Sequence, residues 1–146
     1  MTMNPSQITL IRRSFELLAP QAQETADLFY AQLFRRAPGL RPLFRGDLHS
    51  QGRRLMEMIG AAVGLLNHPD ALLPVLAQLG ARHAGYGVQP GDYRLVGEAL
   101  MATLDERLDR AFDAPTREAW AAMYALVSTT MIAAAGSAAA VERRAA

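Results

Sequence analysis

Apolar side chains recur along most of the chain at the spacing of an amphipathic α-helix, and the pattern breaks where proline and glycine cluster. Asn4 is placed to cap a first helix that has Pro5 in its first turn and that Pro20 interrupts. A second helix is expected through residues 28–34, followed by a short irregular helical turn that ends near Phe44. No run of alternating β-branched or aromatic residues predicts a strand. The predicted fold class is therefore all-α.

Four further helices are predicted in the rest of the chain, separated by the segments NHPD and YGVQPGD. The first covers about residues 50–66, and the second carries His83 on the same face as three leucines. The third passes through Val96, and the fourth begins near Asp113 or Pro115. The side chains predicted to face inward from the helix at 50–66 are those of Leu55, Met58, Ile59, Ala62 and Leu65.

The length of 146 residues predicts a single domain, with a core from about residue 5 to 136 and an Ala-rich tail at 137–146 that is expected to fray. Residues 121–141 carry no charge, and this stretch is long enough to cross a bilayer. It consists mostly of Ala, Ser, Thr and Gly, however, which favours a helix buried in the domain over a membrane anchor. We therefore expect no membrane partner.

Composition removes several classes of site and partner. The chain has 15 basic and 14 acidic side chains, a formal charge of +1 and no cysteine. The absence of cysteine excludes disulfides, thiolate nucleophiles, iron–sulfur clusters and cysteine-type zinc sites. The balanced charge argues against nucleic acid as a partner. The first residues lack the apolar core of a secretory signal, so a cytoplasmic location is expected.

His83 is the candidate for metal chemistry because it lies on the apolar face of its helix. A neutral imidazole there can offer a lone pair to a metal, although a hydrogen-bonded core histidine fits the same pattern. No His-x-x-x-His pair, Glu-x-x-His pair or carboxylate cluster provides further protein ligands. If His83 binds a metal, the remaining ligands must come from a cofactor.

Four segments, taken in order, resemble the globins, most of all bacterial single-domain globins and the haem domain of flavohaemoglobins. The resemblance extends from about Ile8 to Ile132. It implies a globin fold of about seven to eight helices around one pocket for haem b, the iron protoporphyrin. The segments are LFYAQLF (28–34), RPLF (41–44), SQGRRLM (50–56) and LGARHAGYGVQPGDYRLVGEAL (79–100).

The resemblance implies that His83 is the proximal iron ligand and that Phe44 stacks against the haem edge. Tyr30 and Gln51 would line the opposite, distal face as the catalytic pair. Leu55 follows Gln51 by one helical turn and would form an apolar lid over a bound gas. Each of these residues also has a plain interpretation, as a core side chain or, for Gln51, a solvated one.

Other residues in the matching segments are expected to contact the cofactor. Arg54 and Arg82 are placed to reach a haem propionate, Arg54 being the preferred one, and solubility is their alternative role. Tyr93 matches a tyrosine that hydrogen-bonds towards the proximal histidine in the bacterial group. The glutamate that accompanies that tyrosine has no counterpart around residues 134–136. The remaining expected contacts are Tyr86, Val88 and Val96.

The distal pair implied by the resemblance predicts tight oxygen binding, because both side chains are neutral donors to an oxygen with negative character. We expect a nitric oxide dioxygenase that forms nitrate. The chain shows no nucleotide-binding motif, so an external reductase is expected as a partner beside O2 and NO, in a monomer or homodimer. The alternatives are a non-enzymatic oxygen store or gas sensor, a haem-free helical regulatory module, or a six-coordinate electron-transfer protein in which His49, Tyr30 or Gln51 binds iron.

Overall fold

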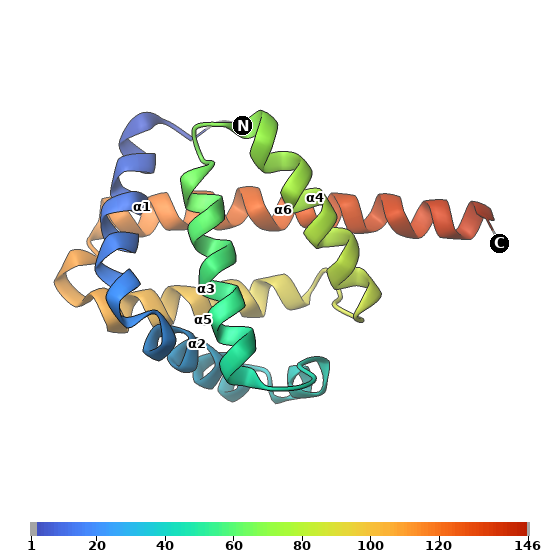
Figure 1. Ribbon diagram of the computed structural model, residues 1–146, viewed down its shortest axis with the longest axis horizontal. Helices are drawn as coiled ribbons and strands as arrows, with labels where there is room; N and C mark the ends of the chain where they lie inside the picture. The colour runs from blue at the N-terminus through green and yellow to red at the C-terminus, as the bar shows by residue number, and fades with distance from the viewer. Residues whose placement is uncertain (1–2, 146) are drawn as a thin grey trace.

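Helices make up nearly all of the protein, for which the computed structural model describes the backbone of residues 3–145 and the side chains of residues 3–137. No strand occurs in these residues, so the all-α prediction is confirmed. The expected seven to eight helices correspond to six α-helices and three short 3₁₀ helices (Figure 1). The elements are α1 (Pro5–Leu18), η1 (Ala19–Gln21), α2 (Ala22–Arg36), η2 (Pro38–Leu43), α3 (Leu48–Gly64), α4 (Pro69–Gly85), α5 (Asp92–Leu108), η3 (Asp109–Ala111) and α6 (Ala114–Ala145).

Local capping signals set the helix starts. Asn4 and Gln7 form a reciprocal capping box at α1, in which the Gln7 amide donates to Asn4 Oδ1 at 2.8 Å. Asp47 accepts from the backbone amides of His49 and Ser50, so α3 begins at Leu48 rather than near Ser50. Hydrogen bonds from the Ser50 hydroxyl and these amides lower the pKa of Asp47. Asp113 caps α6 through the amide of Thr116 at 3.0 Å.

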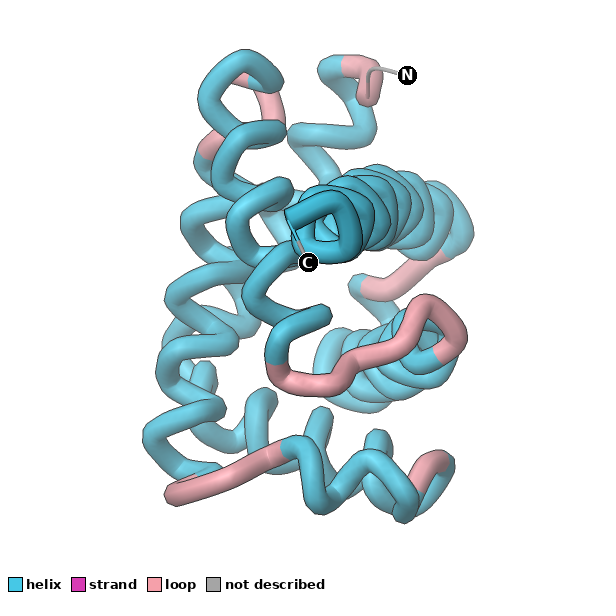
Figure 2. Tube along the Cα trace, turned by 90° about the vertical axis from the view of Figure 1, so that its right-hand side faces the viewer, coloured by secondary structure: helices cyan, strands magenta, loops and turns pink. Residues whose placement is uncertain are grey.

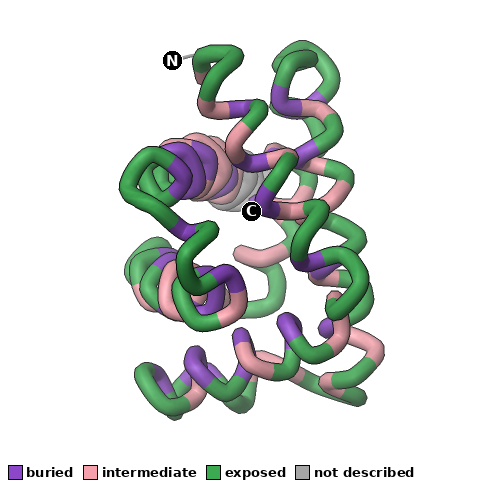
Figure 3. The backbone as a smooth tube through the Cα atoms, turned by 90° about the vertical axis from the view of Figure 1, so that its left-hand side faces the viewer, coloured by how far each residue is buried: buried purple, intermediate pink, exposed green. Residues whose placement is uncertain are grey.

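The helices cross in two directions. α5 and α6 run along the long axis, whereas α1, α3 and α4 cross them, as the two perpendicular views show (Figures 1 and 2). α4 packs mainly on α6, α2 packs on α5 and α3, and α1 packs on α6. Each helix turns its buried face towards the others and leaves an exposed outer face (Figure 3). α3 and α4 are consecutive in the sequence, yet they pack on different helices, α3 on α2 and α4 on α6.

Glycines allow the closest helix contacts. A Cβ atom on Gly80 of α4 would lie 2.3 Å from the carbonyl oxygen of Met131 in α6. A Cβ atom on Gly52 of α3 would lie 2.9 Å from the Cβ atom of Ala26 in α2. No ordinary side chain fits at these distances. The positions of α4 and α3 are therefore fixed by direct contact with the backbone or with a small side chain of the neighbouring helix.

The approach of α3 to α2 at Gly52 also decides which face of α3 is buried. Met56, one turn later, is 7% exposed, whereas Met58 is 37% exposed. The prediction that Met58 faces inward was therefore wrong. The physical reason is that Met58 lies at the edge of the apolar face of α3, where the contact of α3 with α2 decides which side chains are buried.

α6 combines length with apolar composition, and its segment Ala114–Ser137 is long and apolar enough to cross a membrane by these two criteria alone. Trp120 and Met131 of this segment are buried against α1 and α4, but only 22% of its most apolar window is buried, so the helix is covered on one face and not on most sides. The indole Nε1 of Trp120 donates to the Ser14 hydroxyl at 2.7 Å. The helix continues to Ala145, while the side chains of residues 138–146 lie outside the described part of the chain. The expected fraying there stays a prediction.

Candidate functional site

Aromatic rings from α2 and from Phe44, the residue after η2, pack together as one wall of the candidate site, which we call the aromatic wall. The Tyr30 ring stacks on Phe34 with centroids 5.9 Å apart, and Phe44 meets both rings edge-on at 5.5 and 5.2 Å. Phe29 closes the cluster at 5.4 Å from Tyr30. Tyr30 and Phe44, which the resemblance assigns to the same site, are thus neighbours although 14 positions separate them in the sequence.

The Tyr30 hydroxyl is the polar atom of this wall. The side chain is only 7% exposed, and no hydrogen bond joins its hydroxyl to a described residue, although this oxygen is not among the fully buried unpaired atoms. Burial raises the pKa of Tyr30, and the nearby Arg54 guanidinium opposes that rise. A tyrosine with a raised pKa stays protonated at neutral pH. It therefore holds a proton that is available to a ligand beside the aromatic rings.

His83 is held in one orientation on α4. Its Nδ1 lies 2.7 Å from the carbonyl oxygen of Leu79, one turn earlier in the same helix. A carbonyl oxygen only accepts hydrogen bonds, so Nδ1 carries the proton and the neutral ring has its lone pair on Nε2. Metal-ligating histidines usually have this arrangement, in which the other ring nitrogen donates to a carbonyl or carboxylate. His83 can therefore offer Nε2 to a metal.

The side-chain amide of Gln51 is engaged by the loop before α3. Its Nε2 donates to the carbonyl oxygen of Arg45 in the loop before α3. Gly46 makes this loop turn with φ +86°, a conformation that favours glycine. His49 is exposed in the first turn of α3, on a different side of the helix from Leu55. The structure thus favours Tyr30 over both side chains as the donor beside the rings.

Apolar side chains from two helices extend the aromatic wall. Leu55 of α3 and Val96 of α5 are partly buried and pack against the cluster that contains Tyr30 and Phe44. Arg54 is exposed next to Leu55. The structure therefore brings together several contacts that were predicted one by one. Phe44, Leu55 and Val96 pack against the cluster of Tyr30, and Arg54 is near enough to lower the pKa of Tyr30.

The predicted contacts near His83 are distributed differently. Val88 and Tyr93 belong to the other core cluster, the one that joins α1, α4 and α6. The Tyr86 ring centroid lies 6.5 Å from that of His83, but the side chain is 67% exposed. Arg82 is also exposed. Val88 and Tyr93 thus occupy the core on the α4 side of the fold, while Tyr86 and Arg82 remain at its surface.

Tyr93 carries a buried hydroxyl that has no hydrogen-bond partner among the described residues. Burial raises the pKa of this phenol, and Asp92 raises it further. Its backbone carbonyl accepts from the hydroxyl of Tyr124 at 2.5 Å. Buried hydroxyls normally have a hydrogen-bond partner, so we expect the Tyr93 hydroxyl to bond to a group other than the described residues. Sequence reasoning did not anticipate Tyr124, because nothing local distinguishes it from a core tyrosine.

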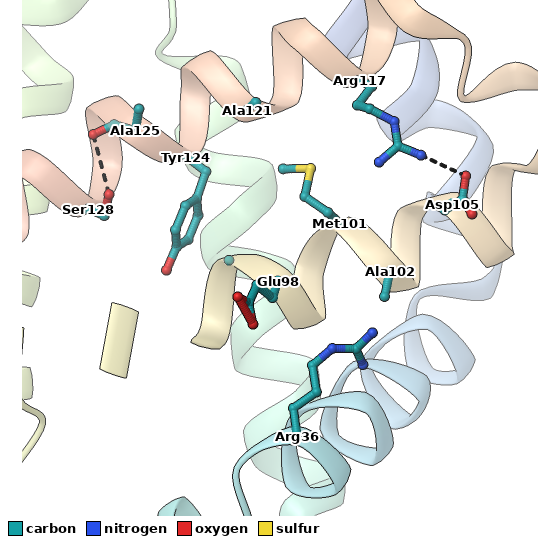
Figure 4. Close-up of a pocket in the computed structure, with 11 residues that line it drawn as sticks. Arg36, Glu98, Met101, Ala102, Asp105, Arg117, Ala121, Tyr124, Ala125 and Ser128 are labelled. Atoms are coloured by element: carbon teal, nitrogen blue, oxygen red, sulfur yellow. Dashed lines mark hydrogen bonds and ion pairs between the residues drawn. The ribbon is translucent and has the colours of Figure 1, made fainter. Parts of the chain in front are cut away.

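A groove of about 760 Å³ lies between α5 and α6, open to solvent (Figure 4). Its floor includes Gly97 and Tyr124, and Asp105 and Arg117 form an ion pair of 3.0 Å at one end. None of the predicted site residues lines it. The groove is therefore separate from the aromatic wall and from His83.

The described side chains contain no group of three or more His, Cys, Asp or Glu residues that could hold a metal ion. A metal at His83 must therefore take most of its ligands from a cofactor. The partly exposed apolar residues Phe44, Leu55 and Val96 of one cluster, and Val88 of the other, suit a large apolar cofactor. The site fits such a group by its donor atom and by the character of its walls.

Comparison with known sequences gives a consistent result. Residues 27–131 match the family model of the globins. The chain is 28% identical over 133 residues to a flavohemoprotein of Vibrio cholerae, which covers 89% of this chain and 34% of the relative. A flavohemoprotein of Halalkalibacterium halodurans is 28% identical over 134 residues, with 90% and 33% covered. The chain thus spans about a third of the length of these relatives.

Comparison with solved structures supports the same fold. An engineered carbene transferase made from a candidate nitric oxide dioxygenase of Rhodothermus marinus superposes with a TM-score of 0.87 at 25% identity. The match covers 97% of this chain and 99% of that one. A bacterial globin of Campylobacter jejuni superposes with a TM-score of 0.82 at 20% identity, covering 92% and 97%.

Proposed function

The chain belongs to the globin family, and from that premise we propose that it binds haem b through His83 and holds dioxygen tightly for reaction with nitric oxide. Family membership and the flavohemoprotein relatives imply haem binding. The observation that carries the residue assignment is the hydrogen bond from His83 Nδ1 to the Leu79 carbonyl, which leaves Nε2 as the ligand. Phe44, Leu55, Val88 and Val96 provide the apolar walls.

Two arginines and two tyrosines complete the proposed haem environment. Arg54 and Arg82 are exposed and carry the charge that a haem propionate needs. The Tyr93 hydroxyl is buried, has no partner among the side chains that the structure describes, and is the proposed donor on the proximal side. The Tyr86 ring centroid lies 6.5 Å from that of His83, so Tyr86 is the proposed surface residue beside the imidazole.

Haem, when bound, supplies reversible coordination of a diatomic gas and one electron, so that nitric oxide, dioxygen and that electron together give nitrate. The protein's contribution is to orient and stabilise the gas. Tyr30 keeps its proton because burial raises its pKa, and its hydroxyl has no competing acceptor among the described residues. Leu55 and Phe44 exclude water from the same side. The reductant that returns the electron is a separate partner in this proposal.

Replacement of Tyr30 by Phe tests the distal assignment. A hydrogen bond to a charged acceptor contributes about 1.5–3 kcal/mol, so its loss should speed oxygen dissociation by roughly tenfold or more. The rate is measured by stopped-flow displacement of oxygen with carbon monoxide. Ser14→Ala removes a buried hydroxyl of α1 that bonds Trp120 and lies outside the site, so it is the control, with an unchanged rate expected. Equal rates in wild type and Tyr30→Phe would show that the phenol does not act on the ligand.

Gln51→Ala distinguishes the two candidate donors. The Gln51 amide donates to the Arg45 carbonyl, whereas the Tyr30 hydroxyl has no partner in the described chain. We therefore expect a smaller acceleration of oxygen dissociation for Gln51→Ala than for Tyr30→Phe. A larger acceleration for Gln51→Ala would assign the main donor role to Gln51 instead.

The assignment of His83 is tested by His83→Gly with and without added imidazole. Loss of the axial ligand should weaken haem retention and change the visible spectrum, and free imidazole should restore the wild-type spectrum. Retention of haem with an unaltered spectrum in His83→Gly would refute the assignment. The ferrous spectrum without gas also tests the alternative of a six-coordinate electron-transfer protein, because a low-spin spectrum would require a second protein ligand.

The proposed reaction is tested by stopped-flow mixing of the oxygenated protein with nitric oxide. We expect rapid formation of the ferric protein and one nitrate per haem. Slow or absent nitrate formation would remove the dioxygenase proposal and would favour storage or sensing of a diatomic gas.

A further inference from the structure

Arginines concentrate in one segment that runs from the end of α2 to the second turn of α3. Residues 35–54 contain six arginines and a single acidic residue, Asp47, whereas the remaining chain has nine arginines and thirteen acidic residues. The near-neutral total therefore hides a strongly basic segment. We call its exposed arginines the arginine surface; they are Arg35, Arg36, Arg41, Arg45, Arg53 and Arg54.

The charge of the arginine surface is not neutralised by the protein. The two ion pairs among the described residues lie elsewhere. Arg35 and Arg36 donate to the neutral amide oxygen of Gln32. Asp47 is the acidic side chain in the segment, and its carboxylate oxygens are engaged by the first amides of α3 and by a hydroxyl. The segment therefore presents its positive charge to solvent.

At Arg41 and Arg45 this segment adjoins the aromatic wall of the candidate site, whereas Arg36 lies at the groove between α5 and α6. The Arg41 guanidinium lies 5.4 Å from the centroid of the Phe34 ring, which stacks on Tyr30. The Arg45 carbonyl accepts from Gln51. A partner seated on these arginines would lie beside the residues proposed to surround the haem.

We propose that the arginine surface docks an acidic electron-transfer protein, which returns the electron consumed in the reaction with nitric oxide. This inference rests on the proposed function. The donor loses one electron, and the ferric haem iron gains it and becomes ferrous. Arginine suits this role because its planar guanidinium pairs with carboxylates in two parallel hydrogen bonds. Opposite charges also raise the rate of encounter, by about 10-fold to 1000-fold at low salt.

The composition of the surface favours a protein over a membrane or a nucleic acid. Basic segments that bind membranes usually add exposed aromatic or aliphatic anchors. The exposed large apolar side chains of the described chain all lie outside residues 35–54. The aromatic rings of the segment, such as Phe44, are partly buried in the wall and are not free to stack on bases. What remains exposed is guanidinium charge, which matches surface carboxylates.

The test uses the full-length haem-loaded protein and reduced flavodoxin as the acidic probe. Arg45→Glu/Arg53→Glu reverses two charges whose guanidinium groups make no hydrogen bond to the described residues. We expect the rate constant for reduction of the ferric protein to fall at least tenfold at low ionic strength and the difference to shrink as salt is added. Calorimetric titration of the ferric protein with oxidised flavodoxin should show a parallel loss of affinity.

Arg13→Glu/Arg110→Glu is the matched control, with the same change of net charge. Arg13 lies in α1 and Arg110 in η3, and both are exposed residues outside the segment 35–54. We expect little change with flavodoxin for this control, and unchanged reduction of either variant by free reduced riboflavin. An equal loss in the control, or no loss in Arg45→Glu/Arg53→Glu, would overturn the proposal. Tighter binding of the wild type to phosphatidylglycerol vesicles or to a DNA duplex than to flavodoxin would also overturn it.

The nitric oxide experiment separates this inference from the proposed function, because mixing oxygenated protein with nitric oxide is a single turnover that needs no donor. If nitrate forms but the charge reversal has no effect on flavodoxin, the docking surface is wrong and the dioxygenase proposal remains. If nitrate does not form but reduction depends on Arg45 and Arg53, the arginine surface serves a different haem reaction.

Discussion

Gly80→Ala is the substitution for which the structure predicts the clearest loss of stability. The added Cβ atom would lie 2.3 Å from the carbonyl oxygen, 2.6 Å from Cα and 2.8 Å from the carbonyl carbon of Met131. All three atoms are backbone atoms of α6, so no side chain can rotate away to make room. α4 must therefore move away from α6, which is the helix on which it mainly packs.

The size of the effect follows from two opposing terms. Overpacking of a core costs about 1–3 kcal/mol, and contact with rigid backbone places this case near the upper end. Alanine in place of glycine returns up to about 1 kcal/mol of helix propensity. Gly85→Ala, in the same helix, isolates the second term because nothing lies within 4 Å of its added Cβ atom. The two variants should therefore differ by about 3 kcal/mol in the free energy of unfolding.

Urea denaturation followed by circular dichroism at the helix band measures this difference. Since a domain of this length shifts by about 3 °C per kcal/mol, the midpoints of thermal unfolding should differ by about 9 °C. The slope of the free energy against urea should be the same in both variants, because the surface exposed on unfolding does not change. Equal stability of Gly80→Ala and Gly85→Ala would refute the conclusion that the contact with Met131 fixes α4.

Three further outcomes follow from individual hydrogen bonds. Ser14→Ala should lower the free energy of unfolding by about 1–3 kcal/mol in urea denaturation, because the buried indole N–H of Trp120 loses its acceptor; an unchanged midpoint would contradict this. Asp47→Ala should destabilise the protein near neutral pH but not in acid: the folded-state pKa of Asp47 is lowered, so its contribution is present above the ordinary value of 3.8 and lost as pH falls through the lowered value. The free energy of unfolding of wild type and Asp47→Ala is measured against pH. A difference that stays the same at every pH would show that Asp47 does not stabilise α3 through its carboxylate. Tyr93→Phe should leave the stability of the haem-free protein equal or higher, because the hydroxyl removed is buried without a described partner; a loss of more than about 1 kcal/mol would show that it has one.

Local signals along the chain were sufficient to predict most helices. Asn4 and Pro5 mark the start of α1, and the proline and glycine clusters mark the breaks. The start of α3 was placed two residues late, because Asp47 caps the helix from within a segment that was expected to be a loop. The resemblance to the globins, based on four short segments, is confirmed by the family model that matches residues 27–131.

The assembly around Tyr30 shows where prediction from the sequence ends. The resemblance brought together Tyr30, Phe44 and Leu55, and the structure has them in one cluster. It did not predict that the Gln51 amide would donate to the Arg45 carbonyl, because this bond depends on the path of the loop through Gly46. The arginine surface was also missed, since a balanced total charge gives no information on where the charges lie.

The sequence by itself determined the fold class, the starts of α1 and α6, both ends of α3 within about two residues, and the position of His83 on an apolar helix face. These properties depend on caps, periodicity and proline, which act over a few neighbouring residues. Tertiary structure alone decided that Met56 rather than Met58 is buried, that Gly80 meets the backbone of Met131, and that the Tyr30 hydroxyl bonds to no residue of the described chain. Each of these depends on contacts between helices or with residues distant in the chain, and the packing of whole helices, rather than any local pattern, fixes such contacts.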